Sequence, residues 1–235
     1  MNAIANGIRE RAPGHIHTAH CSRNRSGIDC YAEPWLDFNT TYSNCNGSFE
    51  AVQDDRERAP AFPFFYIEGS YENESADLGC LIDQVAWPVL GGGGGHVFGN
   101  RPIWLFAAGW EAALAASGSR AMQHVGELFR SRAWFRLDPD YAGDLLVAGA
   151  GAGALAARTS DGESILVYVP TARNLSVDLA PLSGDQAHGW WFDPVDGGSE
   201  DLGVFSATGI ADFAAPGRRF LVLDDAAANL PRPGS

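Results

Sequence analysis

The segment Phe64-Phe65-Tyr66-Ile67-Glu68-Gly69 decides how this chain of 235 residues is interpreted. Its first four residues are apolar or aromatic without alternation, as in a parallel strand that is buried on both faces. An acidic residue that ends such a strand lies at the carboxyl edge of the sheet, where barrel enzymes carry their reacting groups. Burial against aromatic rings can hold the carboxylate in the protonation state that its role needs. Glu68 is therefore the main candidate catalytic residue, and an ion pair with an arginine in the sheet is the alternative.

Strands and helices alternate on both sides of this segment. The strands are predicted at His15–His20, Leu36–Tyr42, Pro63–Glu68 and His96–Phe98. The helices are predicted at Ala3–Arg11, Ser48–Arg58, Asp77–Leu90 and Ser119–Phe135. Four such alternations indicate a parallel sheet with helical crossovers, which is either a doubly wound sheet or part of a barrel.

After Pro139 the sequence changes to short β-rich runs that are separated by turn residues such as Asp161-Gly162. The runs are Ile165–Val169, Asn174–Leu179, Gly189–Phe192, Val204–Ser206 and Phe220–Leu223. No helix of useful length fits between them, so the pattern predicts a compact antiparallel β-sandwich. We therefore expect an α/β domain over residues 1–138, an all-β domain over 139–226 and a loose tail over 227–235.

The composition excludes several classes of protein. Hydrophobic residues make up 46% and charged residues 19%, which is the balance of a globular chain rather than a disordered one. The formal net charge is −13 and every basic residue is an arginine, which argues against nucleic acid as a partner. No apolar run approaches the length of a membrane span, so no membrane partner is expected. Met1–Arg11 lacks the basic start and apolar block of a secretory signal.

Neither the cysteines nor the histidines predict a metal site. The four cysteines all lie in the first third of the chain, at Cys21, Cys30, Cys45 and Cys80. None forms a Cys-x-x-Cys pair, so a structural zinc site is not expected, while isolated thiols and a disulfide both stay open. His15 and His17 would point to one side of a strand and His20 to the other. One of these histidines is therefore expected to line a substrate pocket.

Two glycine-rich segments suggest nucleotide binding, and neither supports it. Gly91–Gly95 precedes a strand instead of joining a strand to a helix, and no Gly-Lys-Ser/Thr follows, so it is not a phosphate loop. Leu145–Ala154 resembles the start of a dinucleotide-binding fold, with Arg173 near the place of a 2′-phosphate partner. The helix that this fold requires is missing, because Asp161-Gly162 interrupts the segment. No cofactor is expected.

Polar and aromatic residues that could form a site follow two of the predicted strands. Tyr71 and Glu72 come directly after Glu68, and His96, Asn100 and Trp104 lie at or just past the end of the next strand. The carboxyl ends of parallel strands meet at one edge of a sheet, so these side chains are expected near Glu68. A tryptophan there can stack on a sugar or belong to the core.

Taken together, these segments resemble the apiosidase-like glycoside hydrolases, a family of cellulase-like barrel proteins. The matching segments of the first domain are Ile16–His20, Glu33–Asn39, Glu68–Glu72, Gly95–Asn100, Ile103–Trp104, Ser131–Arg132 and Trp134. Those of the second domain are Val167–Pro170, Val177–Leu179 and Trp190–Pro194, which resemble a small β-sandwich that carries a collagen-binding label in this family. We expect it to be a packing module, with carbohydrate binding through Trp190 or Trp191 as a lesser alternative.

The resemblance implies the C-terminal half of a (β/α)8 barrel that is followed by the β-sandwich. It implies a retaining glycosidase that acts on plant-type polysaccharide or its side chains outside the cytoplasm, with Glu68 as the nucleophile. The residues expected to line the sugar site are His20, Asn39, Tyr71, Glu72, His96, Asn100 and Trp104.

One departure from the family pattern concerns the second catalytic carboxylate. The acid/base of this clan ends the fourth barrel strand, and the chain is expected to begin just after that point, so a missing half-barrel is an expected partner. Retaining hydrolysis needs two carboxyl groups about 5–5.5 Å apart. Neither Glu33 nor Glu72 has a sequence reason to lie at that distance. The alternative function is therefore a non-catalytic remnant that binds glycan or protein.

Overall fold

A computed structural model describes residues 1–235. The first part of the chain forms α1 (Asn2–Arg11), α2 (Gly27–Cys30), β1 (Asn39–Tyr42), α3 (Ser48–Glu57), β2 (Phe64–Glu68), α4 (Leu78–Leu90), α5 (Arg101–Leu105), α6 (Trp110–Ala113) and α7 (Ser117–Arg130). The second part forms β3 (Leu137–Pro139), β4 (Leu146–Ala148), β5 (Leu155–Thr159), β6 (Ser164–Val169), β7 (Arg173–Asp178), β8 (Gln186–Phe192), β9 (Ser199–Ser206), β10 (Ile210–Ala215) and β11 (Arg219–Asp225). None of the helices combines the length and the apolar character that a membrane crossing needs.

Four segments of the first part lie side by side and run parallel. β1 and β2 form a parallel pair, with Thr41 opposite Tyr66 and Tyr42 opposite Glu68. On one side of this pair Thr18 bridges to Phe38, and on the other side Tyr66 bridges to His96. The carboxyl ends of these segments therefore meet at one edge, as the sequence predicts.

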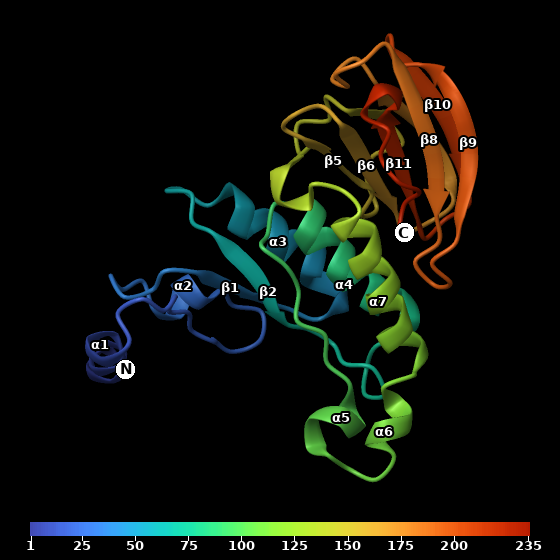
Figure 1. The fold of residues 1–235 in the computed structure, drawn as a ribbon. Coiled ribbons are helices and arrows are strands. Elements are labelled where there is room, and N and C mark those ends of the chain that lie inside the picture. Colours follow the sequence, from blue (N-terminus) through green and yellow to red (C-terminus); the bar gives the residue numbers. More distant parts are fainter.

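Helix α4 is buried on almost all sides because it packs between two sheets. Asp77 caps its N-terminus by accepting a hydrogen bond of 2.7 Å from the Cys80 amide. Nine of its thirteen residues are buried. A helix that is apolar all round lies inside a domain, and in Figure 1 α4 runs between the parallel pair and the antiparallel strands.

The second part of the chain contains two antiparallel sheets with a common core. One sheet has the strand order β3-β5-β6-β11-β8-β9 and the other has the order β10-β7-β4. The side chains between them include Val167 and Leu221 from the larger sheet and Leu175 and Val177 from the smaller one, each at most 1% exposed.

The larger sheet is buried on its other face as well. There Leu166, Tyr168 and Val222 pack against Ile82 of α4 and Val125 of α7. All six residues of β6 are buried, which explains its continuous apolar sequence. Since one core joins α4, α7 and the six-stranded sheet, the two parts of the chain pack as one body (Figure 1).

Two disulfide bonds settle what the sequence left open about the cysteines. Cys21 is bonded to Cys30, and Cys45 is bonded to Cys80, so the chain has no free thiol. The second bond joins the segment before α3 to the first turn of α4.

The C-terminal tail over residues 227–235, which is predicted to be loose, runs back along the molecule. Arg232 donates to the Ser199 carbonyl at 2.7 Å, and the Gly234 amide donates to Ser131 Oγ at 3.2 Å. The tail therefore contacts both β9 and the residue that follows α7.

Several predicted elements differ in detail from the structure. His15–His20 and His96–Phe98 each form a single β-bridge instead of a full strand. The last helix runs over Ser117–Arg130 and ends five residues before the predicted Phe135. The predicted helices Ala3–Arg11 and Ser48–Arg58 correspond to α1 and α3, each within one residue at either end.

The dinucleotide-binding alternative is wrong. Leu146–Ala148 forms the short strand β4, and the glycines after it turn into β5 rather than into a helix. Arg173 holds this turn, because its Nη1 donates to the carbonyl oxygens of Gly149 at 3.1 Å and Gly151 at 2.6 Å.

Candidate active site

The Glu68 carboxylate is held by two side chains at the carboxyl edge of the parallel segments. His20 Nε2 lies 2.6 Å from Glu68 Oε2, and the Tyr71 hydroxyl donates to Glu68 Oε1 at 3.0 Å. The Glu68 side chain is 26% exposed and that of His20 is 40% exposed, so solvent reaches the group. Three of the residues predicted for the site are thus brought together.

The fold explains why these three residues meet. Glu68 is the last residue of β2, and His20 lies two residues beyond Thr18, which pairs with Phe38 before β1. Tyr71 follows Glu68 after a turn and points its hydroxyl back to the strand end. Because the segments that carry His20 and Glu68 run parallel on either side of β1, the two residues lie at the same edge.

His20 lies between two oxygen atoms. Its Nδ1 lies 2.6 Å from the Cys21 carbonyl oxygen, which can only accept a hydrogen bond, and its Nε2 lies 2.6 Å from Glu68 Oε2. These two contacts fix the orientation of the ring and hold it against the carboxylate.

Tyr71 is a neutral hydrogen-bond donor at physiological pH. Burial raises the pKa of its hydroxyl to about 12, and the hydrogen bond to Glu68 acts in the same direction. A phenol that stays protonated can stabilise and orient the carboxylate without adding charge to the site.

Three further side chains complete the surroundings of Glu68. The Tyr42 ring stands edge-on to His20 with centroids 4.9 Å apart, and the Arg23 guanidinium lies 5.8 Å above the same Tyr42 ring. The Trp104 ring lies edge-on to Tyr71 at 6.5 Å. Sequence reasoning missed Tyr42 and Arg23, although Tyr42 ends β1 as Glu68 ends β2 and could have been found by that equivalence.

Asn39 lies in a buried polar network on the helix side of β1. Its amide nitrogen donates to Ser26 Oγ at 2.6 Å and to Asp55 Oδ1 at 3.1 Å, and Thr41 donates to the other Asp55 oxygen at 2.6 Å. Asn39 is 1% exposed and makes no hydrogen bond to Glu68. The network fastens α3 to β1.

Glu72 and Asn100 form a second buried network, which caps helix α7. Glu72 accepts hydrogen bonds from the amides of Gly118 at 2.7 Å and Ser119 at 3.3 Å, and from Asn100 Nδ2 at 2.8 Å. A carboxylate at this position satisfies free N–H groups and opposes the positive end of the helix dipole. The contacts of both residues are structural, and neither hydrogen-bonds to Glu68.

His96 packs beside Tyr66, the central residue of β2. Its ring lies 5.7 Å from that of Tyr66, and burial lowers the pKa of His96 to about 4, which keeps the ring neutral. It therefore lies beside the parallel segments without a hydrogen bond to Glu68. No group of three or more histidine, cysteine, aspartate or glutamate side chains is arranged to hold a metal ion.

Comparisons with known proteins agree with this architecture. A solved structure titled "Glycoside hydrolase" superposes with a TM-score of 0.85, at 22% identity over 96% of this chain and 61% of that one. A glycoside hydrolase family 5 structure from Bacteroides vulgatus ATCC 8482 superposes with a TM-score of 0.86, at 23% identity over 99% of this chain and 60% of that one. The fold is thus that of glycoside hydrolases, and the chain spans about three fifths of the length of these two structures.

Family models identify the group more closely. The model described as "Apiosidase-like, catalytic domain" matches residues 1–136, and the model described as "Putative collagen-binding domain of a collagenase" matches residues 147–224. The chain belongs to the apiosidase-like family, because that match covers more than half of it. Among curated proteins, none matches the chain.

Proposed function

We propose that the protein is a retaining glycoside hydrolase in which Glu68 is the nucleophile. The observation that carries the proposal is the position of Glu68 at the carboxyl end of a parallel strand, with His20 and Tyr71 both bound to its carboxylate. A carboxylate that is oriented by two donors and open to solvent is suited to attack an anomeric carbon.

The reaction would take place in two steps. An oxygen of Glu68 forms a bond to the anomeric carbon while the glycosidic bond breaks and an acid protonates the leaving oxygen. Water then attacks the same carbon as a base removes its proton, and the ester bond to Glu68 breaks. Tyr71 and His20 would hold the carboxylate in the orientation for the first step, since both contact it before the substrate arrives.

We propose that the acid and base of this reaction come from polypeptide outside these 235 residues. The chain spans about three fifths of the two glycoside hydrolase structures that it matches, and the side chains that hydrogen-bond to Glu68, His20 and Tyr71, are not carboxylic acids. We propose that residues 1–138 form half of a (β/α)8 barrel and that residues 139–226 form a β-sandwich packed against it. Ile4, Ile8 and Ile16 support this, because they are 64%, 52% and 74% exposed beside the outermost parallel segment.

We propose that the enzyme removes sugar units, such as apiosyl groups, from plant-type polysaccharides or their side chains, as the family resemblance implies. Trp104 is 53% exposed and lies next to Tyr71, which supports a role for its ring in stacking on a sugar. The two disulfides are typical of proteins that fold in an oxidising compartment, in agreement with action outside the cytoplasm.

The second domain would support the first rather than bind collagen. Its six-stranded sheet packs on α4 and α7, and Trp191 is buried in the core between the two sheets. Trp190 packs partly against the core that the two domains share. We therefore propose a packing module, in which Trp190, but not Trp191, retains a partly exposed ring that could contact a glycan.

The proposal is tested with 2,4-dinitrophenyl glycosides of common pentoses, including apiose, and hexoses. These compounds need little acid assistance, because dinitrophenolate leaves without a proton. The chain should release dinitrophenolate from one of them, and Glu68→Gln should abolish this release. Glu57→Gln, which changes an exposed glutamate of α3, is the matched control and should keep the activity. Release by Glu68→Gln at the rate of the control would refute the role of Glu68.

A non-catalytic glycan-binding role is the second candidate. It is favoured by the hydrogen-bond partners of Glu68, since neither His20 nor Tyr71 is a carboxylic acid. Binding of oligosaccharide without release of reducing sugar, and without reaction of any activated glycoside, would support this role over the enzyme.

A further inference from the structure

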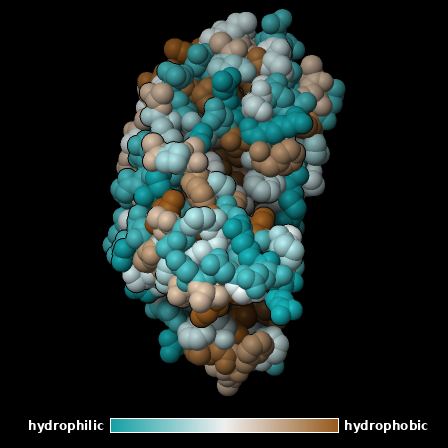
Figure 2. Space-filling view, turned by 90° about the vertical axis from the view of Figure 1, so that its left-hand side faces the viewer, coloured by the Kyte–Doolittle hydropathy of each residue, from teal (hydrophilic) through white to brown (hydrophobic).

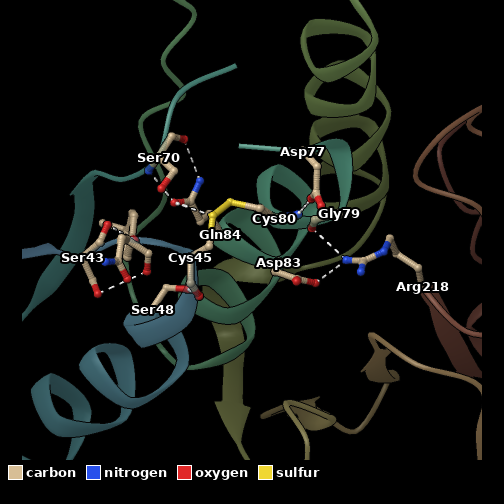
Figure 3. Close-up of a disulfide and its surroundings, with 12 residues drawn as sticks. Ser43, Cys45, Ser48, Ser70, Asp77, Gly79, Cys80, Asp83, Gln84 and Arg218 are labelled. Carbon is tan, nitrogen blue, oxygen red and sulfur yellow. Dashed lines mark hydrogen bonds and ion pairs between the residues drawn. A yellow bond between two sulfur atoms is a disulfide. The ribbon is translucent and has the colours of Figure 1, made fainter. Parts of the chain in front are cut away.

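The backbone that follows Glu68 is held by one buried side chain from helix α4. Gln84 is 1% exposed, and its Oε1 accepts a hydrogen bond of 2.6 Å from the Ser70 amide. Its Nε2 donates to the Ser70 carbonyl oxygen at 3.0 Å. One glutamine thus satisfies both backbone groups of a residue that lies between Glu68 and Tyr71 (Figure 3).

The loop passes so close to Gln84 that it leaves no room for a side chain at residue 69. The path of Gly69 brings its backbone so close to Gln84 that a Cβ at residue 69 would overlap the glutamine oxygen. A side chain there would have to displace either the loop or Gln84. Glu68, Gly69 and Ser70 therefore follow a path that depends on the glutamine.

Gln84 itself is fixed because α4 is anchored on several sides. The disulfide between Cys45 and Cys80 ties the first turn of α4 to the segment before α3, and Figure 3 shows it next to Gln84. Asp83, the neighbour of Gln84, accepts a hydrogen bond of 2.7 Å from Arg218 and another from the Tyr168 hydroxyl. Both partners belong to the antiparallel part of the chain or its loops.

We propose that Gln84 is a positioning residue, which holds the Ser70 backbone so that the carboxylate of Glu68 stays between His20 and Tyr71. The catalytic consequence rests on the function proposed above. Asp83 contacts the second domain and Gln84 contacts the loop that follows Glu68, so α4 connects the two.

The test uses Gln84→Met, which has nearly the volume of glutamine and lacks both hydrogen bonds. Its control is Gln123→Met, the same change at an exposed glutamine of α7 whose amide contacts only Glu127. Gln84→Glu serves as a second variant if the first does not fold, because it retains an acceptor for the Ser70 amide and loses only the donor.

The first readout is hydrogen exchange of the Ser70 amide in the 235-residue chain. Gln84→Met should speed this exchange by about 10-fold or more, and Gln123→Met should leave it unchanged. The second readout is the rate at which diethylpyrocarbonate modifies His20, followed by peptide mapping. In Gln84→Met this rate should move toward that of Glu68→Gln, in which the carboxylate partner of His20 is absent.

These two readouts decide the proposal without any turnover. Faster exchange of Ser70 with an unchanged His20 rate would overturn it, since Gln84 would then hold the loop but not Glu68. Unchanged exchange of the Ser70 amide in Gln84→Met, or an unchanged His20 rate in Gln84→Glu, would overturn it as well. Failure of every activated glycoside with the wild-type chain would count against the proposed function alone.

The kinetic readout applies to an activated glycoside that the wild type cleaves. Misplacement of a reacting group by about 1 Å can cost about 100-fold in rate, so kcat of Gln84→Met should fall by about 10- to 100-fold. KM should change little, because Gln84 does not face the substrate. A fall in activity that only follows loss of folded protein, with kcat per folded molecule unchanged, would contradict the positioning role.

Discussion

Replacement of Arg132 by methionine tests how the two parts of the chain are joined. Arg132 follows α7, and its guanidinium donates to both oxygens of Asp224 on β11, at 2.8 Å from Nε and 2.6 Å from Nη2. Both side chains are almost fully buried, with exposed fractions of 0% and 4%. Ser164 Oγ also donates to Asp224, at 2.6 Å, and is the only other side chain that hydrogen-bonds to this carboxylate.

The expected loss of stability is large because Arg132→Met would leave a buried carboxylate without a counter-charge. Breaking a buried ion pair by removing one partner costs about 3–5 kcal/mol. For a chain of this size each kcal/mol lowers Tm by about 2–4 °C, so Tm should fall by about 10 °C. The double variant Arg132→Met with Asp224→Asn removes the unpaired charge and should recover about half of the loss.

Chemical denaturation followed by tryptophan fluorescence and calorimetry measures both quantities. Arg136→Met is the matched control, because its guanidinium is 51% exposed and pairs with Asp161 at the surface. Surface pairs contribute about 0–1 kcal/mol, so the control should lose little. Equal, small losses in Arg132→Met and Arg136→Met would refute the reasoning that this buried pair joins α7 to the sheet.

Three further predictions concern other parts of the structure. Glu72→Gln should lower the free energy of unfolding by about 1–3 kcal/mol, because the Glu72 carboxylate accepts hydrogen bonds from the N-terminus of α7. Glu74 is more exposed, so Glu74→Gln should lower it much less, and urea unfolding measures both variants. Burial lowers the pKa of His96 from 6.5 to about 4, so the unfolded chain binds a proton at this residue before the folded chain does as the pH falls. His96 therefore does not lower the free energy of unfolding above pH 6.5, and it lowers it progressively between pH 6.5 and pH 4. This loss is at most about 3 kcal/mol, and the difference in unfolding free energy between pH 7 and pH 4 should shrink in His96→Gln. The double variant Cys45→Ser with Cys80→Ser opens a loop of 35 residues, which should lower the free energy of unfolding by about 3–4 kcal/mol in the chain-entropy model. The same change at Cys21 and Cys30 opens a loop of 9 residues and should lower it less. A larger loss for the shorter loop would contradict that order.

The sequence predicts those parts of the fold in which local pattern and burial agree. Three elements are examples: β2, α4 and β6. In each of them the apolar residues of the sequence are buried or partly buried by the fold, so the pattern alone predicts the element. The short helices α5 and α6 are not predicted by the sequence. Trp104 of α5 and the residues that directly follow the two helices, Phe106 and Leu114, are exposed, and Figure 2 shows apolar surface at this lower tip of the molecule. Without a buried face, such a segment has no periodicity to read.

The candidate site is predictable only in part, for the same reason. Glu68, His20 and Tyr71 lie at or just past the ends of predicted strands, and sequence patterns can locate such ends. Glu72 and Asn100 occupy equally suitable positions in the sequence, yet they turn inward to cap α7. Whether a polar side chain at a sheet edge faces the substrate or a helix terminus depends on tertiary packing.

The same limit applies to Gln84. It lies in an apolar helix sequence with no motif around it, and its importance depends on a contact with Ser70, fourteen residues earlier. Only the three-dimensional arrangement shows that this glutamine supports the loop after Glu68.

The central claim is that Glu68 is a nucleophile, and covalent trapping tests it most directly. The protein is incubated with 2,4-dinitrophenyl 2-deoxy-2-fluoroglycosides, in which fluorine slows the release of the glycosyl-enzyme and the leaving group requires no acid. The account predicts one added glycosyl group on the peptide that contains Glu68 and none in Glu68→Gln. Turnover of the parent glycoside with the label on another residue, or equal labelling of Glu68→Gln, would contradict it.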